Sequence, residues 1–470
     1  MNQDPSRYLV LFAPWLLATL LADYPIVSFA VSWLGHFFIL YIVFSQRINP
    51  LAFPVSIKEQ VLHPLILNQL LFCGFSGISS IFYFLDVNGY YFLDKLPYKT
   101  PDPDLIHQTA IVQSYYVLAH AALVIGLYSF INRARKPQTW RVVLGKYPSI
   151  SLLLVSGLAF AMRFAILNFE PLRQVVPMFD GLTLVSIVMS MALAIKEKNV
   201  IILSIVTPIF VTFIINAVLS GWKEEMLVPF LLLGFFLYSY FPKTVLIIAP
   251  FFAYIYFVYV PTFNAVFRNL NWVKGEDKTI AYQIALSETL NAEGEDIGSN
   301  NWEFFAYRLS EMDMFVRFTK VVPDKKPYYG LALPLQGLAS IVPRALYKEK
   351  AHTEQQVMRR VYDSGIVDAQ SSVSAKPAFV ADCYLAGGIL GIIIGCFTLG
   401  TIISFITRQL DEWYGGYALG TGLMYNAIFN ELWRGNCIEF VVALMFWGFV
   451  VAYLLHYLAK FGKLIVPVNS

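Results

Sequence analysis

The chain has 470 residues, a length that in a soluble protein would suggest about three domains. Hydrophobic residues make up 57 % of it and charged residues only 14 %, whereas soluble domains hold about 45–50 % apolar and about 25 % charged residues. With a net charge of +3, this composition predicts a polytopic membrane protein. It excludes a soluble enzyme, a disordered chain, a disulfide scaffold and a nucleic-acid-binding protein.

Apolar runs along the chain predict an all-α transmembrane helix bundle of about 12 spans, because a spanning helix needs about 20 apolar residues. The predicted spans are residues 8–22, 25–44, 63–84, 106–131, 148–169, 178–195, 199–219, 226–241, 244–260, 379–405, 414–430 and 437–458. The first run lacks a clear small-residue cleavage site, so we interpret it as a retained span and not as a signal peptide.

Basic residues in the short loops predict the orientation of the bundle, because they mark the cytoplasmic side. With both termini cytoplasmic, the cytoplasmic segments hold fourteen Lys and Arg residues and the short outer loops hold five. This arrangement predicts three regions: spans 1–9 in residues 1–260, a long extracytoplasmic loop in 261–378 with amphipathic and interfacial helices, and spans 10–12 with a cytoplasmic tail in 379–470. Long loops are exempt from the charge rule, so the basic residues of 261–378 do not contradict it.

The first part of the long loop has helical periodicity over residues 300–322. A polar face includes Asp313 and an opposite arc is apolar, with Arg308 in the middle of that arc. Two interpretations of Arg308 stay open: its stem packs while its head reaches water, or it is a buried cation that faces an anionic ligand.

Residues 328–348 are mostly apolar but are interrupted by Pro and Gly, which favours an interfacial or re-entrant segment over a spanning helix. The segment ends in basic residues that include Arg344, a pattern that suits a lipid with an anionic headgroup or a simple surface anchor. Thr353 resembles the N-cap of a helix that ends near Gly365. His352 precedes that helix and is the only histidine in the loop, either incidental or catalytic.

Arg163 lies within the fifth predicted span, where an ionisable residue is functional by default unless a partner neutralises it. Glu170 lies near the same helical face and is the predicted partner. Asp382 and Glu439 lie just inside the tenth and twelfth spans. Six cations could meet in one outer vestibule and bind a phosphate group: Arg163, Arg173, Lys223, Arg308, Arg344 and Arg434.

Metal and cofactor motifs are missing from the sequence: it has no Gly-rich phosphate loop, no HExxH, no GxSxG and no carboxylate cluster with metal-ligand spacing. The cysteines lie in or beside apolar stretches without CxxC spacing, which is typical of small apolar residues in helices. We therefore expect electrostatic and acid/base chemistry with no metal and no cofactor.

Three stretches of the sequence carry a resemblance to a known family. Residues 219–223 (Leu-Ser-Gly-Trp-Lys) resemble a Ser-Gly-x-Arg start of a span, with Lys in place of Arg. Tyr329-Gly330 with 341–348 (Ile-Val-Pro-Arg-Ala-Leu-Tyr-Lys) resembles a Tyr-x-Gly and Ile-Pro-Arg-x-Leu-Trp-Pro-x-Lys pattern without its Trp and second Pro. Residues 381–391 resemble a span in which Tyr precedes Gly-x-x-Gly. With the layout of spans and one late outer loop, these stretches resemble the oligosaccharide repeat-unit polymerases of the O-antigen polymerase type.

The resemblance implies a metal-independent glycosyltransferase in the bacterial inner membrane that joins undecaprenyl-diphosphate-linked oligosaccharides into a surface polysaccharide. Arg344, Lys223 and Arg163 would then bind the diphosphate, with Arg308, Arg173 and Arg434 as further candidates. Position alone makes His352, Asp313 and Glu311 the candidates for the base that deprotonates the acceptor hydroxyl. Expected partners are the lipid-linked oligosaccharide, membrane lipids and a chain-length regulator, and no nucleic acid.

Three alternatives stay open. An O-antigen ligase-like transferase would use the same chemistry on another acceptor. A lipid-phosphate-sugar glycosyltransferase would need an acidic first outer loop, which around Asp23 is only about three residues long. A flippase or secondary transporter would show two similar halves, and the sequence has no internal repeat.

Overall fold

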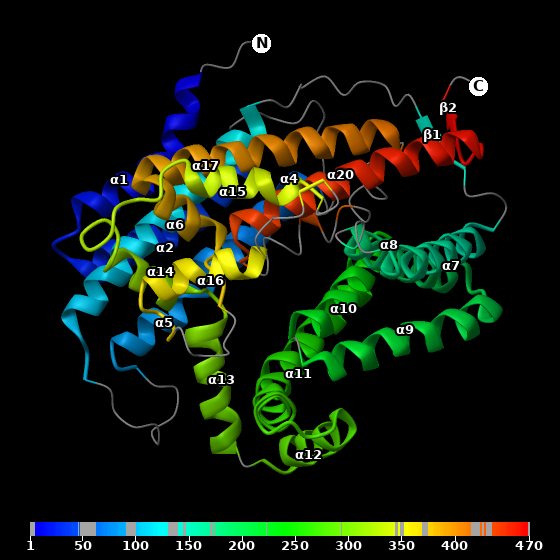
Figure 1. The fold of residues 1–470 in the computed structure, drawn as a ribbon, viewed down its shortest axis with the longest axis horizontal. Coiled ribbons are helices and arrows are strands. Elements are labelled where there is room, and N and C mark those ends of the chain that lie inside the picture. The colour runs from blue at the N-terminus through cyan, green and yellow to red at the C-terminus, as the bar shows by residue number, and fades with distance from the viewer. Residues whose placement is uncertain are drawn as a thin grey trace. The chain divides into compact units, whose positions relative to one another are not determined.

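The computed structural model describes residues 5–45, 47, 63–90, 100–129, 140–143, 147–169, 173, 175–221, 223–292, 294–343, 346–347, 352–368, 375–414, 424, 427–428 and 435–468. In these ranges, helices dominate the structure (Figure 1). The elements in chain order are η1 (Pro5–Phe12), α1 (Ala13–Leu20), α2 (Pro25–Phe44), α4 (Pro64–Phe72), η2 (Cys73–Ile78), α5 (Ser80–Val87), α6 (Pro103–Ser129), β1 (Trp140–Val142), α7 (Pro148–Leu167), α8 (Val176–Glu197), α9 (Val200–Ser220), α10 (Lys223–Tyr238), α11 (Pro242–Arg268), η4 (Asn269–Val273), α12 (Lys278–Asn291), α13 (Gly294–Arg308), α14 (Met312–Thr319), α15 (Ala332–Ile341), α16 (Thr353–Asp363), α17 (Phe379–Trp413), α20 (Ile438–Phe461) and β2 (Ile465–Pro467).

Nine helices in the described part of the chain are long and apolar enough to cross a membrane. They are Pro25–Phe44, Pro64–Val87, Pro103–Tyr128, Pro148–Leu167, Val176–Glu197, Val200–Ser220, Pro242–Val273, Phe379–Trp413 and Ile438–Phe461. The predicted spans 8–22 and 226–241 correspond to shorter apolar helices, Ser6–Leu20 and Glu225–Tyr238. The predicted span 414–430 lies mostly outside the described residues. The prediction of an all-α fold is confirmed.

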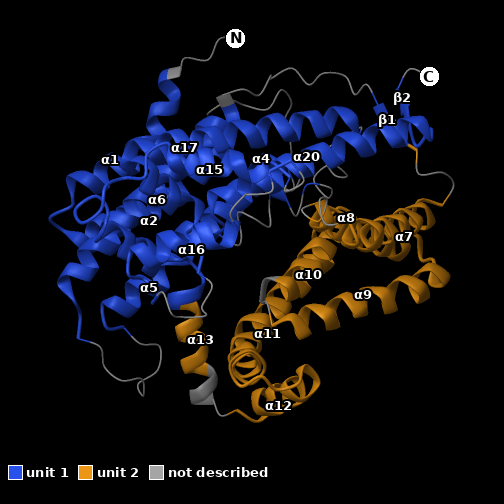
Figure 2. Ribbon diagram, viewed as in Figure 1, with its two compact units in different colours: residues 1–90, 98–142, 306–470 blue, residues 91–97, 143–305 orange. Residues whose placement is uncertain are grey.

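The chain divides into two compact units (Figure 2). Unit 1 comprises residues 1–90, 98–142 and 306–470, and unit 2 comprises residues 91–97 and 143–305. The boundary between Phe305 and Ala306 lies inside the predicted long loop 261–378, so that loop contributes to both units.

Unit 1 is built around α6. The most apolar stretch of this helix is 83 % buried, the largest share among the nine membrane-length helices described. α6 packs against α2 and α17. At the contact with α17, a Cβ atom on Gly126 would collide with the Phe397 carbonyl, and one on Gly400 would collide with the Leu123 carbonyl. Small residues therefore let the two backbones approach closely, as is common between helices in membranes.

The two strands of the described structure join distant parts of unit 1. β1 and β2 pair antiparallel, with Arg141 opposite Val466. β1 follows α6 and β2 follows α20, so the pair brings the segment after α6 to the C-terminal tail. The Lys460 ammonium also lies 4.3 Å from the centre of the Trp140 ring.

Unit 2 is a series of neighbouring helices: α7 packs on α8, α8 on α9 and α10, and α11 on α12. The helix ends follow simple chemistry. Pro148 and Pro242 stand at the first positions of α7 and α11, where proline has no backbone donor to lose. The Asn199 side chain caps α9 by accepting from the Ile202 N–H, and Gly221 ends that helix with a φ of +72°.

The predicted single helix over 300–322 is wrong. The structure has two helices there, α13 and α14, and Glu311 between them adopts a left-handed φ of +52°. A contact from another helix stabilises the interruption between α13 and α14: the Tyr116 hydroxyl donates to the carbonyl of the buried Ser310 at 3.1 Å. A tertiary contact therefore overrides the helical periodicity of the sequence.

Segment 328–348 contains α15, which with ten residues is too short to span a bilayer. The helix predicted to start at Thr353 is α16, but its N-cap is His352 and Thr353 is its first residue. It ends at Asp363, and Gly365 follows with a φ of +65°.

Candidate functional site

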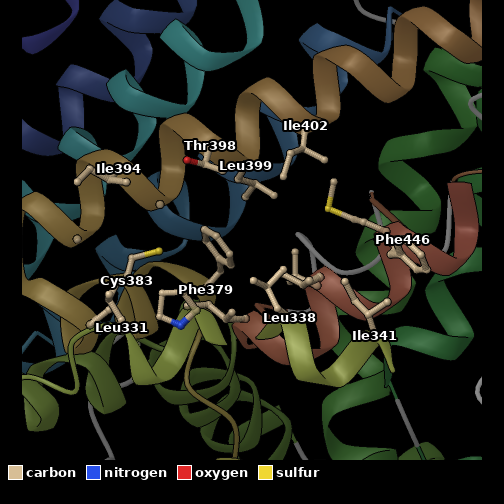
Figure 3. Close-up of a pocket in the computed structure, with 18 of the residues that line it drawn as sticks. Leu331, Leu338, Ile341, Phe379, Cys383, Ile394, Thr398, Leu399, Ile402 and Phe446 are labelled. Carbon is tan, nitrogen blue, oxygen red and sulfur yellow. The ribbon is translucent and has the colours of Figure 1, made fainter. Parts of the chain in front are cut away.

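An apolar cavity of about 760 Å³ lies in unit 1 between α15, α17 and α20. Leu338 and Ile341 come from α15, and Phe446 comes from α20 (Figure 3). Cys383 and Ile394 line it from α17. Thr398 is the only lining side chain with a hydroxyl among the described residues, so the cavity suits an apolar ligand such as a hydrocarbon chain.

The wall contributed by α17 is broken at Gly387–Gly388. Gly388 has a φ of +60°, and a Cβ atom there would lie 2.8 Å from the Tyr328 hydroxyl. The Tyr329 N–H, from the segment before α15, donates to the Leu385 carbonyl at 2.9 Å. The break thus leaves a carbonyl to bond with a neighbouring segment, as broken membrane helices require.

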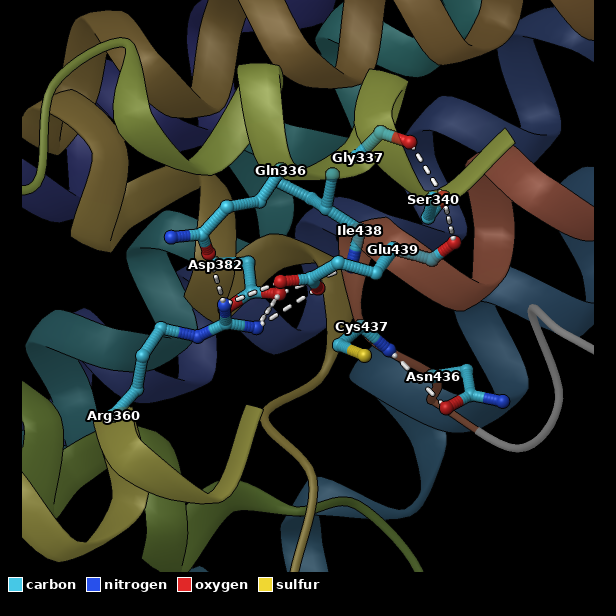
Figure 4. A network of polar contacts seen from close by, with 9 residues as sticks. All are labelled: Gln336, Gly337, Ser340, Arg360, Asp382, Asn436, Cys437, Ile438 and Glu439. Carbon is cyan, nitrogen blue, oxygen red and sulfur yellow. Dashed lines mark hydrogen bonds and ion pairs between the residues drawn. The ribbon is translucent and has the colours of Figure 1, made fainter. Parts of the chain in front are cut away.

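A buried ion cluster lies on the short segment of α17 before this break (Figure 4). The Arg360 guanidinium of α16 donates from Nη1 to Glu439 Oε1 at 2.6 Å and from Nη2 to Glu439 Oε2 at 3.0 Å. Arg360 Nη2 also donates to Asp382 Oδ2 at 3.1 Å. The exposed fractions of the Arg360, Asp382 and Glu439 side chains are 3 %, 0 % and 1 %. We call these three residues the Arg360 cluster.

Polar neighbours fix the Arg360 cluster in place. The Ile438 N–H donates to Asp382 Oδ2 at 3.0 Å, and Arg360 Nη1 also donates to the Gln336 side chain at 3.3 Å. Burial alone lowers the pKa of the Arg360 guanidinium, but the charges of Asp382 and Glu439 outweigh it, and this pKa lies above its ordinary value. Arg360 is therefore a permanent cation, and the cluster ties α16 to the first turns of α17 and α20.

The Arg360 cluster and the apolar cavity lie next to each other, because neighbouring residues at the starts of α17 and α20 contribute to both. Ile438 lines the cavity with its side chain and bonds Asp382 with its N–H. Cys383, the residue after Asp382, also lines the cavity. A change in the cluster is therefore expected to move two walls of the cavity.

Asp382, Cys437 and Glu439 hold one potential ligand atom each within 4.8 Å of one another, and all three residues are buried. These types of residue bind metal ions. Here, however, the Arg360 guanidinium binds both oxygens of Glu439 and one of Asp382. A divalent ion added to Arg360 and the two carboxylates would leave the buried cluster with a surplus positive charge, so we assign no divalent metal to these residues.

The structure places the three predicted base candidates at the starts of two helices, α14 and α16. Asp313 accepts a hydrogen bond from the Tyr83 hydroxyl at 3.0 Å and pairs with Arg317 at 3.0 Å. Glu311 is half-buried at the break before α14. His352 is exposed at the N-cap of α16. Asp313 and Glu311 thus lie at the start of one helix, and His352 lies at the start of another.

The six predicted cations divide between the two units. Arg163 pairs with Asp180 of α8 at 2.5 Å, and Arg173 is exposed and donates to the Leu167 carbonyl at 3.2 Å. Lys223 is the first residue of α10.

Arg308 is exposed at the end of α13 in unit 1, so it is not a buried cation. Arg344 and Arg434 lie outside the described residues.

The predicted partner of Arg163, Glu170, also lies outside the described residues, and Asp180 was missed. Arg360, which among the described cations has the most contacts to carboxylates, was missed as well. A signal for it existed: at helical spacing Arg360 lies on one face with Val357 and Val361, which are buried, whereas Arg359 is exposed. An arginine on the apolar face of an amphipathic helix indicates a buried partner.

In its described residues this is an all-α protein with nine helices long and apolar enough to cross a membrane, and with an apolar cavity lined by α15, α17 and α20. The chain belongs to a family described as a domain of unknown function (DUF8712), which matches residues 13–467. No curated protein and no solved structure matches the chain.

Proposed function

We propose that this protein is a bacterial inner-membrane polymerase that joins undecaprenyl-diphosphate-linked oligosaccharide repeat units into a surface polysaccharide. The glycan leaves one lipid diphosphate and is transferred to a sugar hydroxyl of a second lipid-linked unit. The chain would supply cations that stabilise the departing diphosphate and a base that takes the proton of the hydroxyl.

The observation that carries the proposal is where the resembling stretches lie in the fold. Tyr329-Gly330 and the residues from Ile341 onward are distant in sequence from the stretch 381–391, yet Gly330, Ile341 and Gly391 all line the apolar cavity. The N–H of Tyr329 bonds the carbonyl of Leu385, which lies inside that stretch. The stretches that resemble the family therefore lie around one cavity, which a chance resemblance would not require. The apolar lining of this cavity suits the polyprenyl chain of a lipid carrier.

The proposed topology has 12 spans, both termini cytoplasmic and the loop 261–378 periplasmic, and contacts of α6 support one part of it, the opposite placement of the loop and the C-terminal tail. At the start of α6, the Asp104 carboxylate pairs with Lys320 of the loop at 2.7 Å. Beyond the other end of α6, β1 pairs with β2 of the C-terminal tail. The loop and the tail therefore contact opposite ends of one membrane-length helix, as they do when they lie on opposite sides of the membrane.

Arg163 is a candidate for binding the diphosphate because it is a cation within a predicted span. It lies in the last turns of α7, and its side chain is 30 % exposed although it pairs with Asp180. An arginine with exposed donors can bind phosphate oxygens. Arg344 follows the cavity-lining residue Ile341 by three positions and stays a candidate from the sequence.

One observation favours a transporter as the second candidate. Discontinuous helices such as α17, broken at Gly387–Gly388, are frequent at the substrate sites of secondary transporters. A flippase for lipid-linked glycans would use the same cavity without breaking a glycosidic bond.

The glycan profile of a deletion strain separates these functions. Loss of a polymerase leaves surface lipid capped with a single repeat unit. Loss of a ligase removes every capped product and leaves the polymer on its carrier, and loss of a flippase leaves single units on the inner leaflet. Accumulation of the single-unit cap supports the proposal, and its absence contradicts it.

A further inference from the structure

The Arg360 cluster carries unequal charge. One guanidinium faces two carboxylates, Asp382 and Glu439, and all three side chains are at most 3 % exposed. If every group is ionised, one negative charge is left without a counterion. A buried, uncompensated charge costs several kcal/mol, as an order of magnitude.

The hydrogen bonds show where the surplus charge lies. Glu439 has a donor on each oxygen, since Arg360 binds it through both terminal nitrogens. Asp382 accepts from Arg360 and from the Ile438 N–H, and both bonds end on Oδ2. Asp382 Oδ1 is fully buried and has no hydrogen-bond partner among the described residues. A buried polar atom without a partner requires an explanation.

Among the residues that the structure describes, no other source of positive charge reaches this atom. Asp382 and Glu439 stand in the first turns of α17 and α20, where the helix dipole favours anions. The Ile438 N–H that delivers this effect to Asp382 binds Oδ2, not Oδ1. The titratable and charged groups that interact with Asp382 come from α16, from the start of α20, from the segment before α15 and from its own helix: Arg360, Glu439, Cys437, Tyr329 and Cys383. Arg360 is the only permanent cation in this set.

We propose that the Arg360 cluster is a binding site for one monovalent cation, a proton or Na⁺, held at Asp382 Oδ1. The bound cation brings the cluster to zero net charge. Its loss leaves a buried negative charge at the junction of α16, α17 and α20, next to the walls of the cavity. Cation occupancy therefore controls the stability of this junction, whether the cavity serves a polymerase or a transporter.

The test is thermal unfolding of the purified full-length protein in detergent, at constant ionic strength. One arm lowers the pH in N-methylglucamine salts, and the other adds Na⁺ at fixed alkaline pH. A cation that binds only the folded state stabilises it by mass action. If the cation is a proton, lowering the pH stabilises the folded wild type. For each pH unit of acidification, its unfolding equilibrium constant is expected to fall about tenfold relative to a neutral variant, across the range where only the folded state binds the proton.

Asp382→Asn and Glu439→Gln each remove one negative charge, so either variant is expected to lose the response to the cation that the wild type binds. Asp104→Asn is the matched control, because Asp104 forms an exposed ion pair with Lys320. This control is expected to respond like the wild type. Two neutral variants are used so that one can fail to fold without ending the test.

The two arms identify the cation. A response to pH alone that both neutral variants lose assigns a proton, and a response to Na⁺ alone assigns Na⁺. A wild type that responds to neither cation overturns the proposal, and so does a response that Asp382→Asn or Glu439→Gln retains in full. None of these outcomes depends on glycan synthesis, so the proposed function can fail independently.

Discussion

Two arginines of this protein, one in each unit, pair with carboxylates in opposite surroundings. Arg360 in unit 1 binds Asp382 and Glu439 where all three side chains are almost inaccessible. Arg163 in unit 2 binds Asp180 with the two side chains 30 % and 45 % exposed. Both contacts join a guanidinium to a carboxylate, and they differ in how far the paired side chains are exposed to solvent.

The difference assigns the two arginines to different tasks. Arg360 uses its donors on three helices of its own chain, so it fixes the structure around the cavity. Among the described residues, Arg163 has one carboxylate partner, Asp180, and its side chain is partly exposed, so it can exchange that partner for a ligand.

Removing the buried cation is expected to have the largest effect. Arg360→Met leaves two buried carboxylates without their partner, and breaking a buried ion pair costs about 3–5 kcal/mol. The measurement is the unfolding midpoint in detergent, together with the yield of folded protein. Arg359→Met is the control, because Arg359 is the exposed neighbour on the same helix. Equal losses in both variants would show that the cluster has no special role.

The break in α17 is expected to have an intermediate effect. Gly388→Ala puts a Cβ atom at a φ of +60° and against the Tyr328 hydroxyl, and such backbone strain costs about 1–3 kcal/mol. The unfolding midpoint again measures the change. In Gly387→Ala the new Cβ atom meets nothing within 4 Å and the φ of −172° is extended backbone, so it should be close to neutral. If Gly387→Ala were the more damaging variant, this description of the break would be wrong.

Removing the half-exposed pair is expected to change stability little. Arg163→Ala should cost about 0.2–1 kcal/mol, the range of exposed ion pairs. The same variant should abolish chain lengthening if Arg163 binds the diphosphate. A double-mutant cycle with Asp180→Ala measures the pair, and the glycan ladder measures activity. A large loss of stability with a normal ladder would place Arg163 with Arg360 as a structural residue.

The smallest effect is expected for an exposed carboxylate. The Asp277 side chain caps α12 by accepting from the Thr279 N–H at 2.8 Å. Backbone hydrogen bonds, first that of Thr279, lower the pKa of this carboxyl. A lowered pKa contributes stability at neutral pH that is lost as the pH falls through the folded-state value. The difference in unfolding midpoint between the wild type and Asp277→Ala should therefore shrink between about pH 5 and pH 3. A difference that grows on acidification would contradict the capping role.

The sequence predicted what depends on local pattern and missed what depends on distant contacts. Apolar runs located the nine long helices, because hydropathy and length are local properties. Asp382 and Glu439 were recognised as charges near span ends. Their partner Arg360 was missed, because the pairing joins residues separated by 79 positions for Glu439. The break at Glu311 depends on a contact from Tyr116, 194 residues before the Ser310 carbonyl it binds, and no local pattern shows it.

On the proposed function, the cavity between α15, α17 and α20 holds the lipid chain of the glycan carrier. The most direct measurement is the glycan ladder of a deletion strain complemented with Leu390→Trp or with Ile389→Trp. Leu390 lines the cavity, whereas its neighbour Ile389 does not and is also partly exposed. We expect Leu390→Trp to fill the cavity and give only the single-unit cap, and Ile389→Trp to restore the ladder at equal protein level. A full ladder with Leu390→Trp would contradict the claim.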